Sequence, residues 1–497
     1  MSSPKLTTDH APAMGDIMTA SGVAFGTSGA RGLVVQMTDR VCYAYTAGFL
    51  QYLEQLGELP RVGRVAVAGD LRSSTERIMG ACLQAIADRG FTPVHAGRVP
   101  TPALARYAFA ERIPSLMVTG SHIPDDRNGI KFYRPTSEVL KSDEAGMKAQ
   151  RVALPASFDA QDMLKAGARA AFPAVLPDVA RSYVARYACA FGESVLRGAR
   201  VGLYGHSAVG RDLCGEILLG LGAHVEKLGY SERFIPVDTE AIRPEDVRAA
   251  AEWARGGAYD AIVSTDGDSD RPLVSDERGK WLRGDIAALL TAKFLGATFV
   301  ATPVSCNTAV ERWRAFRHVE RTRIGSPYVI EAMNRALGGD DRVVGYEANG
   351  GFLSATPLAV AGELPALPTR DAVIVLLAVL CFARREGRKI SELVGDLPRR
   401  FTASDRLEDF PTELSQRHLR ELTAGGVSAV HTMFPQLGPV QDLSSVDGLR
   451  ITFESGEIVH LRASGNAPEL RCYTEADREE RAVQLNASAL AVLRSWA

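Results

Sequence analysis

The sequence predicts an α/β protein of several domains, and three observations support this prediction. The chain has 497 residues, which at roughly 100–200 residues per domain corresponds to three or four domains. Short apolar strands alternate with helices in three successive stretches, the pattern of sheets covered by helices. The final segment instead pairs two strands before a last strand and a helix. We therefore expect three similar α/β domains followed by an α+β domain.

The first α/β stretch occupies the first third of the chain. Residues Ser73 to Glu76 read SSTE, a capping box that opens a helix ending near residue 89. A second helix is expected at 101–112. The expected strands are 64–69, 91–95 and 115–119.

The second and third stretches repeat this order. The expected strands are 200–204, 224–228 and 260–265, then 298–304 and 342–346, and the helices are 210–221, 244–255, 309–316 and 328–337. Each of the three stretches ends its last strand in a polar loop that contains glycine, at 120–124, 266–270 and 347–351. Open α/β sheets bind ligands at the carboxyl ends of their strands. Three such loops could therefore line one cleft.

The final segment has a different pattern. Paired strands at 449–453 and 458–462 surround a turn, a loop follows at 463–468, and a strand at 469–473 precedes a helix at 477–496. Linkers are plausible at 150–178 and near 397–398.

Composition excludes several classes of protein. Lysine and arginine number 57 against 59 acidic residues, so no nucleic-acid or membrane-surface partner is expected. Seven cysteines without a CxxC pair argue against disulfides and zinc. The apolar run 372–383 is too short to span a membrane and predicts a buried helix. The N-terminus lacks the apolar core of a signal peptide, so we expect a cytoplasmic protein.

Three aspartates follow the strand 260–265, namely Asp266, Asp268 and Asp270. In an extended stretch such positions share a face, where carboxylates repel one another unless a hard cation such as Mg²⁺ lies between them. A calcium EF-hand is an alternative because Glu277 falls at its last position. However, Arg271 stands where that loop needs glycine, and a strand precedes it. A solvated acidic turn is the other alternative. We favour a Mg²⁺ site.

Ser121 directly follows a strand, with Gly120 before it. A serine hydroxyl is a weak nucleophile unless a base, a metal or a cation activates it, and His122 and Lys131 are nearby candidates. Taken alone, this pattern favours an ordinary turn residue and a structural histidine.

Two loops combine glycine, hydroxyls and arginine, a composition that suits an oxyanion. The first, FGTSGARG at 25–32, contains Arg31. The second, RASGNAPELR at 462–471, offers Arg462, Ser464, Gly465, Asn466 and Arg471. Each alone could equally be a glycine turn beside a surface arginine. In the loop GYEANGG at 345–351, Glu347 and Asn349 could hydrogen-bond sugar hydroxyls.

Together, five segments in this order resemble the α-D-phosphohexomutase family, which includes phosphomannomutases and phosphoglucomutases. They are FGTSGARG, TGSHIPDDRNGIKFY, DGDSDRP, GYEANGG and RASGNAPELR, and they extend from residue 25 to 471. The resemblance implies four domains around a central cleft, three of them similar α/β domains with mixed sheets. The domains are expected at 1–155 (phosphoserine loop), 156–282 (metal loop), 283–397 (sugar-binding loop) and 398–497 (phosphate-binding α+β domain).

The resemblance also implies a role for each site residue. Ser121 would be the phosphoserine, and its phosphate would hold Mg²⁺ together with Asp266, Asp268 and Asp270. The other catalytic groups would be Arg31, Lys131, His122 and Arg271. Glu347 and Asn349 would bind sugar hydroxyls. The phosphate that does not react would be held by Arg462, Ser464, Gly465, Asn466 and Arg471.

The implied reaction interconverts hexose 6-phosphate and hexose 1-phosphate through a 1,6-bisphosphate, with mannose the leading sugar. Two departures from the family pattern concern Ile123, where asparagine is commoner, and the sugar loop, which has Asn349 for serine and Gly351 for histidine. The alternatives are glucose as the sugar or a bifunctional activity, and less so glucosamine or a phosphatase. A sugar-phosphate sensor of the same fold would show eroded catalytic residues, and Arg31, Ser121, Lys131 and the three aspartates are all present. The expected partner is a small sugar phosphate, and the expected state is a monomer or weak homo-oligomer.

Overall fold

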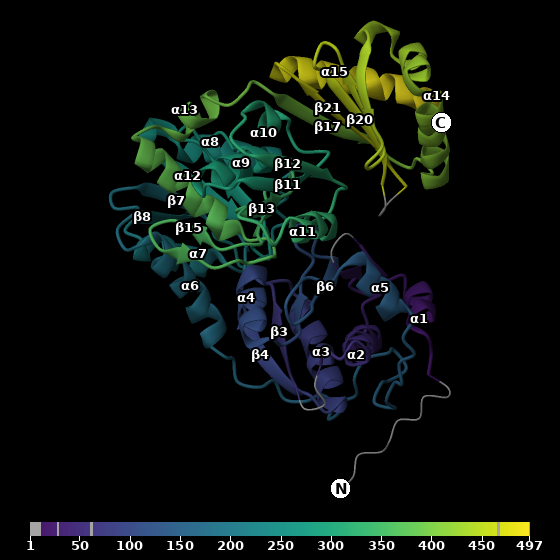
Figure 1. Ribbon diagram of the computed structural model, residues 1–497. Helices are drawn as coiled ribbons and strands as arrows, with labels where there is room; N and C mark the ends of the chain where they lie inside the picture. The colour runs from purple at the N-terminus through teal and green to yellow at the C-terminus, as the bar shows by residue number, and fades with distance from the viewer. Residues whose placement is uncertain (1–10, 27–28, 60–62, 465–467, 497) are drawn as a thin grey trace. The chain divides into compact units, whose positions relative to one another are not determined.

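The computed structural model describes residues 11–26, 29–59, 63–464 and 468–496. It divides into two compact units (Figure 1). The first comprises Met1–Gly296 and Asn349–Ser391, and the second comprises Ala297–Ala348 and Glu392–Ala497.

The first unit begins with a six-stranded mixed sheet in the order β1-β2-β6-β5-β3-β4. β3 runs parallel to β4 and β5, whereas β6 is antiparallel to both β5 and β2. The strands are β1 (Ala24–Phe25), β2 (Ala30–Leu33), β3 (Arg64–Gly69), β4 (Thr92–Arg98), β5 (Ser115–Val118) and β6 (Arg127–Tyr133). The accompanying helices are α1 (Met14–Ser21), α2 (Asp39–Gln55), α3 (Thr75–Asp88), α4 (Thr101–Glu111) and α5 (Lys141–Lys148).

The expected capping box at the start of α3 is wrong. Ser74 is the N-cap residue and its side chain makes no capping hydrogen bond. The Ser73 hydroxyl instead donates to Asp125 at 3.2 Å.

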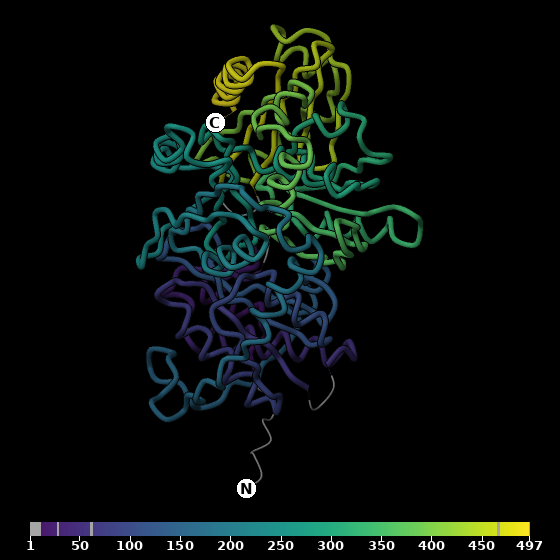
Figure 2. The backbone as a smooth tube through the Cα atoms, turned by 90° about the vertical axis from the view of Figure 1, so that its left-hand side faces the viewer, coloured from purple at the N-terminus to yellow at the C-terminus, as the bar shows by residue number. Residues whose placement is uncertain are grey.

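The segment 151–177 forms no helix and only isolated bridges, and its blue tube lies at the rim of the purple and blue part of the chain (Figure 2). The Leu164 amide donates to the buried Asp39 carboxylate on α2 at 3.0 Å. Further along, the Leu176 amide donates to the His95 carbonyl at 2.9 Å. The predicted linker is therefore packed against the unit rather than free.

The first unit continues with a four-stranded sheet in the order β10-β9-β7-β8. Its strands are β7 (Arg200–Tyr204), β8 (His224–Leu228), β9 (Ala261–Thr265) and β10 (Pro272–Val274). Its helices are α6 (Asp178–Phe191), α7 (Arg211–Gly220), α8 (Pro244–Trp253), α9 (Gly284–Phe294) and α12 (Ala372–Glu386), and the short strands β14 (Phe352–Ser354), β15 (Leu358–Ala359) and β16 (Glu363–Leu364) precede α12. As expected for its apolar run, α12 is buried from Ala372 to Ala383 and packs on α9.

The second unit contains β11 (Phe299–Pro303) between the parallel strands β12 (His318–Thr322) and β13 (Val343–Tyr346). The helices α10 (Ala309–Arg312) and α11 (Ser326–Arg335) accompany these strands, and α13 (Ile390–Gly395) lies at the boundary of the two units.

The second unit also contains an antiparallel sheet in the order β17-β21-β20-β19-β18. Burial alternates along β19, as expected for a sheet with one covered face. Two helices pack on this sheet (Figure 1) and share its apolar core. The elements are β17 (Phe401–Leu407), α14 (Thr412–Met433), β18 (Val440–Ser444), β19 (Leu449–Phe453), β20 (Ile458–Ala463), β21 (Leu470–Ala476) and α15 (Glu479–Leu493).

The four larger sheets thus follow the expected succession of three α/β regions and an α+β region. Within the described part of the chain, no helix combines the length and apolarity that crossing a bilayer requires.

Candidate active site

Ser121 lies in the turn after β5 in a backbone conformation that serine rarely adopts. Its φ is 55°, in the left-handed region that costs a non-glycine residue energy. Both of its backbone groups are held, because the Ser121 amide donates to Thr119 Oγ1 at 2.7 Å and its carbonyl accepts from Arg72 at 2.9 Å. The surrounding structure therefore fixes the position of the Ser121 hydroxyl.

Arg72 is a buried cation that organises this turn. Its guanidinium pairs with Asp70 at 3.2 Å. It also donates to the carbonyls of Ser121, Ile123, Pro124 and Arg127 at 2.5–3.0 Å. A Cβ on Gly120 would lie 2.6 Å from Arg72 Cζ. This close approach is why glycine stands before the serine.

Three carboxylates converge beside Ser121. Asp266, Asp268 and Asp270 are buried, and each offers one carboxylate oxygen that lies within 4.8 Å of those of the other two. The expectation that an extended stretch brings them together is wrong, because the loop turns tightly. Asp266 Oδ1 accepts the amides of Asp270 and Arg271 at 3.1 and 3.2 Å, and this folds the loop back on itself.

The serine and the carboxylates are linked directly. The Ser121 hydroxyl donates to Asp266 Oδ2 at 2.5 Å. Lys131 on β6 is almost fully buried, and its Nζ lies 2.6 Å from Asp268 Oδ2 and 2.5 Å from Asp270 Oδ2. The Thr101 hydroxyl at the start of α4 also donates to Asp268.

The pKa values of Asp266 and Asp268 are shifted in opposite directions. Burial, followed by repulsion from Asp268 and Asp270, raises the pKa of Asp266 well above its usual range. Burial alone would raise the pKa of Asp268, but Lys131, Thr101 and Arg370 bring it below its usual range. Uncompensated repulsion among buried carboxylates is the situation that a divalent cation relieves.

Two arginines and a histidine complete this group. Arg271 NH1 donates to His122 Nδ1 at 3.0 Å. That nitrogen is therefore the acceptor of a neutral ring and lies 3.3 Å from Ser121 Oγ. Burial, reinforced by Arg271 and Arg31, holds the pKa of His122 well below its usual value. Burial and the neighbouring Arg271 and Arg370 likewise lower the pKa of Arg31, on β2, to about 10.

Arg370, which the sequence patterns did not predict, also belongs to this cluster. It is 1% exposed, and its Nε and NH2 lie 3.1 and 3.0 Å from Asp270 Oδ2.

The expected sugar loop is divided between the two units. Glu347 follows β13 in the second unit and is buried. Asn349 lies in the first unit, where its carbonyl accepts from the Thr239 hydroxyl at 2.8 Å and its Oδ1 accepts from the Gly351 amide at 2.9 Å.

The expected phosphate loop lies between β20 and β21 in the second unit. Arg462 and Arg471 are directly opposite each other in the register of these strands. Like charges placed opposite each other are unfavourable, and here they are offset by Asp447, 2.9 Å from Arg462, and by Glu469, 3.1 Å from Arg471. Ser464 is buried beside them. Gly465 and Asn466 lie outside the described residues.

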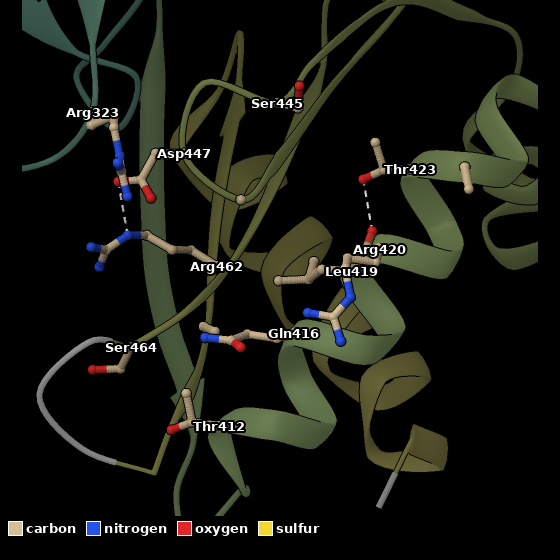
Figure 3. A pocket seen from close by; sticks show the side chains of 13 residues that line it. Arg323, Thr412, Gln416, Leu419, Arg420, Thr423, Ser445, Asp447, Arg462 and Ser464 are labelled. Carbon is tan, nitrogen blue, oxygen red and sulfur yellow. Dashed lines mark hydrogen bonds and ion pairs between the residues drawn. The ribbon is translucent and has the colours of Figure 1, made fainter.

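A cavity of about 720 Å³ adjoins this loop (Figure 3). Asp447 lies on its wall, where Asp447 Oδ2 accepts from Arg462 Nε at 2.9 Å and from the Ile324 amide at 3.0 Å. Figure 3 shows Arg323 beside the same carboxylate and Arg420 on the α14 side. Three arginines among the lining residues make this cavity suitable for an anionic ligand.

Comparison with known proteins identifies the family of this chain. Residues 22–150, 283–401 and 419–491 match models described as phosphoglucomutase/phosphomannomutase α/β/α domain I, α/β/α domain III and C-terminal domain. The chain belongs to the phosphoglucomutase/phosphomannomutase family.

Relatives and solved structures agree with this assignment. A phosphomannomutase of Salmonella muenchen is 42% identical over 97% of both chains. One of Sinorhizobium fredii is 44% identical over 95% of this chain and 99% of its own length. A putative phosphomannomutase from Thermus thermophilus shares the fold, with a TM-score of 0.71, 21% identity and coverage of 94% of this chain and 99% of that one. These matches agree with the predicted four-domain architecture, which has three α/β domains with mixed sheets and a C-terminal α+β domain.

An Aspergillus fumigatus N-acetylphosphoglucosamine mutase, solved in complex with GlcNAc-6P and magnesium, also shares the fold of this phosphohexomutase. Its TM-score is 0.60 at 14% identity, with coverage of 98% of this chain and 99% of that one.

The carboxylate cluster of this phosphohexomutase fits a divalent cation. Asp268 Oδ1 and Asp270 Oδ1 are buried, and each has no hydrogen-bond partner within the described residues. Oxygen-only donors of this kind suit Mg²⁺.

Four residues of the site were missed by the sequence patterns. Asp70 and Thr101 follow β3 and β4, and their position near strand ends was a usable signal. Arg72 and Arg370 reach the site through side chains that cross from one loop to another, which no local pattern indicates.

Proposed function

We propose that this phosphohexomutase interconverts mannose 6-phosphate and mannose 1-phosphate through a phosphoserine at Ser121. The observation that carries the proposal is the hydrogen bond that the Ser121 hydroxyl donates to Asp266, one of the three clustered carboxylates. It is supported by full-length relatives named phosphomannomutase.

In the first half-reaction, phospho-Ser121 donates its phosphoryl group to the free hydroxyl of the sugar phosphate. The P–O bond to Ser121 Oγ breaks and a P–O bond to the sugar oxygen forms. The sugar hydroxyl loses its proton and Ser121 Oγ gains one, so a hexose 1,6-bisphosphate and a free serine hydroxyl result. The bisphosphate then reverses its orientation, and its other phosphoryl group returns to Ser121. When Ser121 accepts that group, its hydroxyl loses a proton, the P–O bond to the sugar oxygen breaks, and the released sugar oxygen gains a proton.

The cations of the first unit oppose the charge of the transferring group. Phosphoryl transfer depends mainly on positioning and on electrostatic stabilisation. Lys131, Arg31 and Arg271 supply positive charge, and His122 is held neutral beside the serine. Asp266, Asp268 and Asp270 would hold Mg²⁺, which when bound neutralises phosphate oxygens.

The second unit supplies groups for the phosphate that does not react. Arg462, Ser464 and Arg471 offer two cations and a hydroxyl, and Gly465 and Asn466 belong to the same loop. A site that grips either phosphate lets one set of catalytic groups serve both orientations of the bisphosphate. Glu347 and Asn349 would bind the sugar hydroxyls. The domain limits that the family resemblance implies are 1–155, 156–282, 283–397 and 398–497.

The test is phosphorus NMR of the full chain with Mg²⁺ and a trace of hexose 1,6-bisphosphate. Mannose 1-phosphate, glucose 1-phosphate and glucosamine 1-phosphate are compared at matched concentration. We expect mannose 1-phosphate to be converted to its 6-phosphate fastest, without release of inorganic phosphate. Preferred conversion of another sugar would contradict the mannose assignment, and net release of inorganic phosphate would indicate a phosphatase.

A further inference from the structure

Arg370 contacts one oxygen of Asp270, a carboxylate that the proposed function assigns to the metal site. Its Nε and NH2 both approach Asp270 Oδ2, at 3.1 and 3.0 Å, and Lys131 Nζ lies 2.5 Å from the same oxygen. Two cations thus engage a single carboxylate oxygen. The orientation of the Asp270 carboxylate is fixed by these contacts.

The other oxygen of Asp270 is left for a different partner. Asp270 Oδ1 is buried and has no hydrogen-bond partner in the described part of the chain. Arg271 Nε is 3.8 Å from it, beyond hydrogen-bond distance. Asp268 repeats the arrangement, because Lys131 and Thr101 engage its Oδ2 while its Oδ1 has no hydrogen-bond partner among the residues described.

The backbone of Arg370 is itself anchored. The next residue, Asp371, is the N-cap of α12 and accepts from the Val373 amide at 3.2 Å. Its carboxylate also accepts from the buried hydroxyls of Tyr183, at 2.8 Å, and Tyr187. Arg370 therefore projects from a rigid start of a buried helix.

Gly351 provides the space that the Arg370 side chain occupies. A Cβ built on Gly351 would lie 2.6 Å from Arg370 Cδ and 2.8 Å from its Cγ. Real Cβ atoms do not approach other atoms so closely. Any side chain at position 351 would displace the stem of Arg370 and with it the guanidinium at Asp270.

We propose that Gly351 and Arg370 form a matched pair that positions Asp270 for the divalent cation. Arg370 is a positioning residue, since it acts through Asp270, and Gly351 is the residue that admits it. The inference rests on the metal site of the proposed function. Residues that orient metal ligands affect metal affinity strongly when they are replaced.

The test measures metal binding directly, by electron paramagnetic resonance of Mn²⁺ titrated into the full chain without substrate. Arg370→Met is expected to weaken Mn²⁺ binding about tenfold or more. Arg370→Lys keeps the charge but loses the two-nitrogen contact, and should fall between Arg370→Met and the unaltered protein. Gly351→Ala should weaken binding in the same direction.

The double variant carries the sharpest prediction. If Gly351 acts through Arg370, Gly351→Ala should add little loss once Arg370→Met is present, because contacting residues are not additive. Gly220→Ala is the matched glycine control, since a Cβ there meets nothing within 4 Å. Arg400→Met, which removes another buried arginine in the second unit, controls for loss of stability.

The outcomes separate this inference from the proposed function. Folded Arg370 variants that bind Mn²⁺ as the unaltered protein does would overturn the inference, as would independent, multiplying losses in the double variant. A melting temperature recorded for each protein identifies variants that fail to fold. If Arg370→Met is one of them, Mn²⁺ binding by Arg370→Lys decides the test. If the expected Mn²⁺ losses are seen but the unaltered protein converts no sugar phosphate, the inference stands and the proposed function fails.

Discussion

At the scale of single residues, the candidate nucleophile Ser121 is held in place by a buried network around its backbone. Asp70 accepts from the Thr119 hydroxyl at 2.7 Å and pairs with Arg72, and these two residues in turn hold the backbone of Ser121. A strained conformation persists only where its surroundings over-determine it. We infer that this buried network determines where the Ser121 hydroxyl points.

Arg72→Lys is predicted to slow turnover more than it weakens substrate binding. A single ammonium cannot reach the four carbonyls that the planar guanidinium contacts, so the turn should shift. Misplacement of a reacting group by about 1 Å can cost about a hundredfold in rate. Steady-state kinetics should show a fall of about ten- to a hundredfold in kcat with KM changed less than about twofold.

The matched control is Arg77→Lys on α3, whose guanidinium bonds to Asp39 and to carbonyls outside the serine turn. It should leave kcat near that of the unaltered protein. An equal loss of kcat in both variants would contradict a specific role of Arg72 at the serine turn.

At the scale of elements, prediction succeeded where local pattern and tertiary role agree. β7, β8 and β19 have the expected bounds, because each is a short run that is followed directly by a glycine or by a charged turn residue. β6 was not predicted, since RNGIKFY has weak alternation and its pairing with β2 and β5 is long-range. α14 was not predicted, because Gly425 and Gly426 interrupt it and Gly426 has a φ of 59°.

The site residues followed the same rule: those marked by a local pattern were predicted, and those placed by long-range contacts were not. Loops that follow strands, such as the one containing Ser121 and the one containing Asp266, could be found from strand ends and residue type. Arg370 could not, because its contact with Asp270 joins positions a hundred residues apart. The tight turn that brings the three aspartates together was also not predicted. Its Ser269 has a φ of 59°, and no local sequence pattern indicates this conformation.

A prediction at this scale concerns the loop between β20 and β21. Asp447 accepts from Arg462 and from the Ile324 amide, so it links the strand that carries the proposed phosphate ligand to the loop after β12. Asp447→Asn removes the charge and weakens the hold on Arg462. We expect KM for the sugar phosphate to rise about tenfold, because a charge-assisted hydrogen bond contributes about 1.5–3 kcal/mol.

Asp442→Asn on β18 is the control, since this aspartate is exposed on the same sheet. It should leave KM unchanged. If Asp447→Asn lowered kcat alone, with KM unaltered, the carboxylate would not act through phosphate binding.

At the scale of the whole molecule, the proposed groups are distributed over both units. The serine, the carboxylates and the cations that contact them belong to the first unit, and the arginine pair of the phosphate loop belongs to the second. Turnover is therefore expected to require residues from both units. Transfer of phosphate between the serine and a sugar is the step on which the whole proposal depends.

The measurement that tests this step most directly is transfer of radiolabelled phosphate from hexose 1,6-bisphosphate to the protein, followed by peptide mapping. We expect label on the peptide containing Ser121 and its release to mannose 1-phosphate when that sugar is added. Ser121→Ala should take up no label and show no mutase turnover. Unchanged turnover in Ser121→Ala, or label on another residue, would contradict the account.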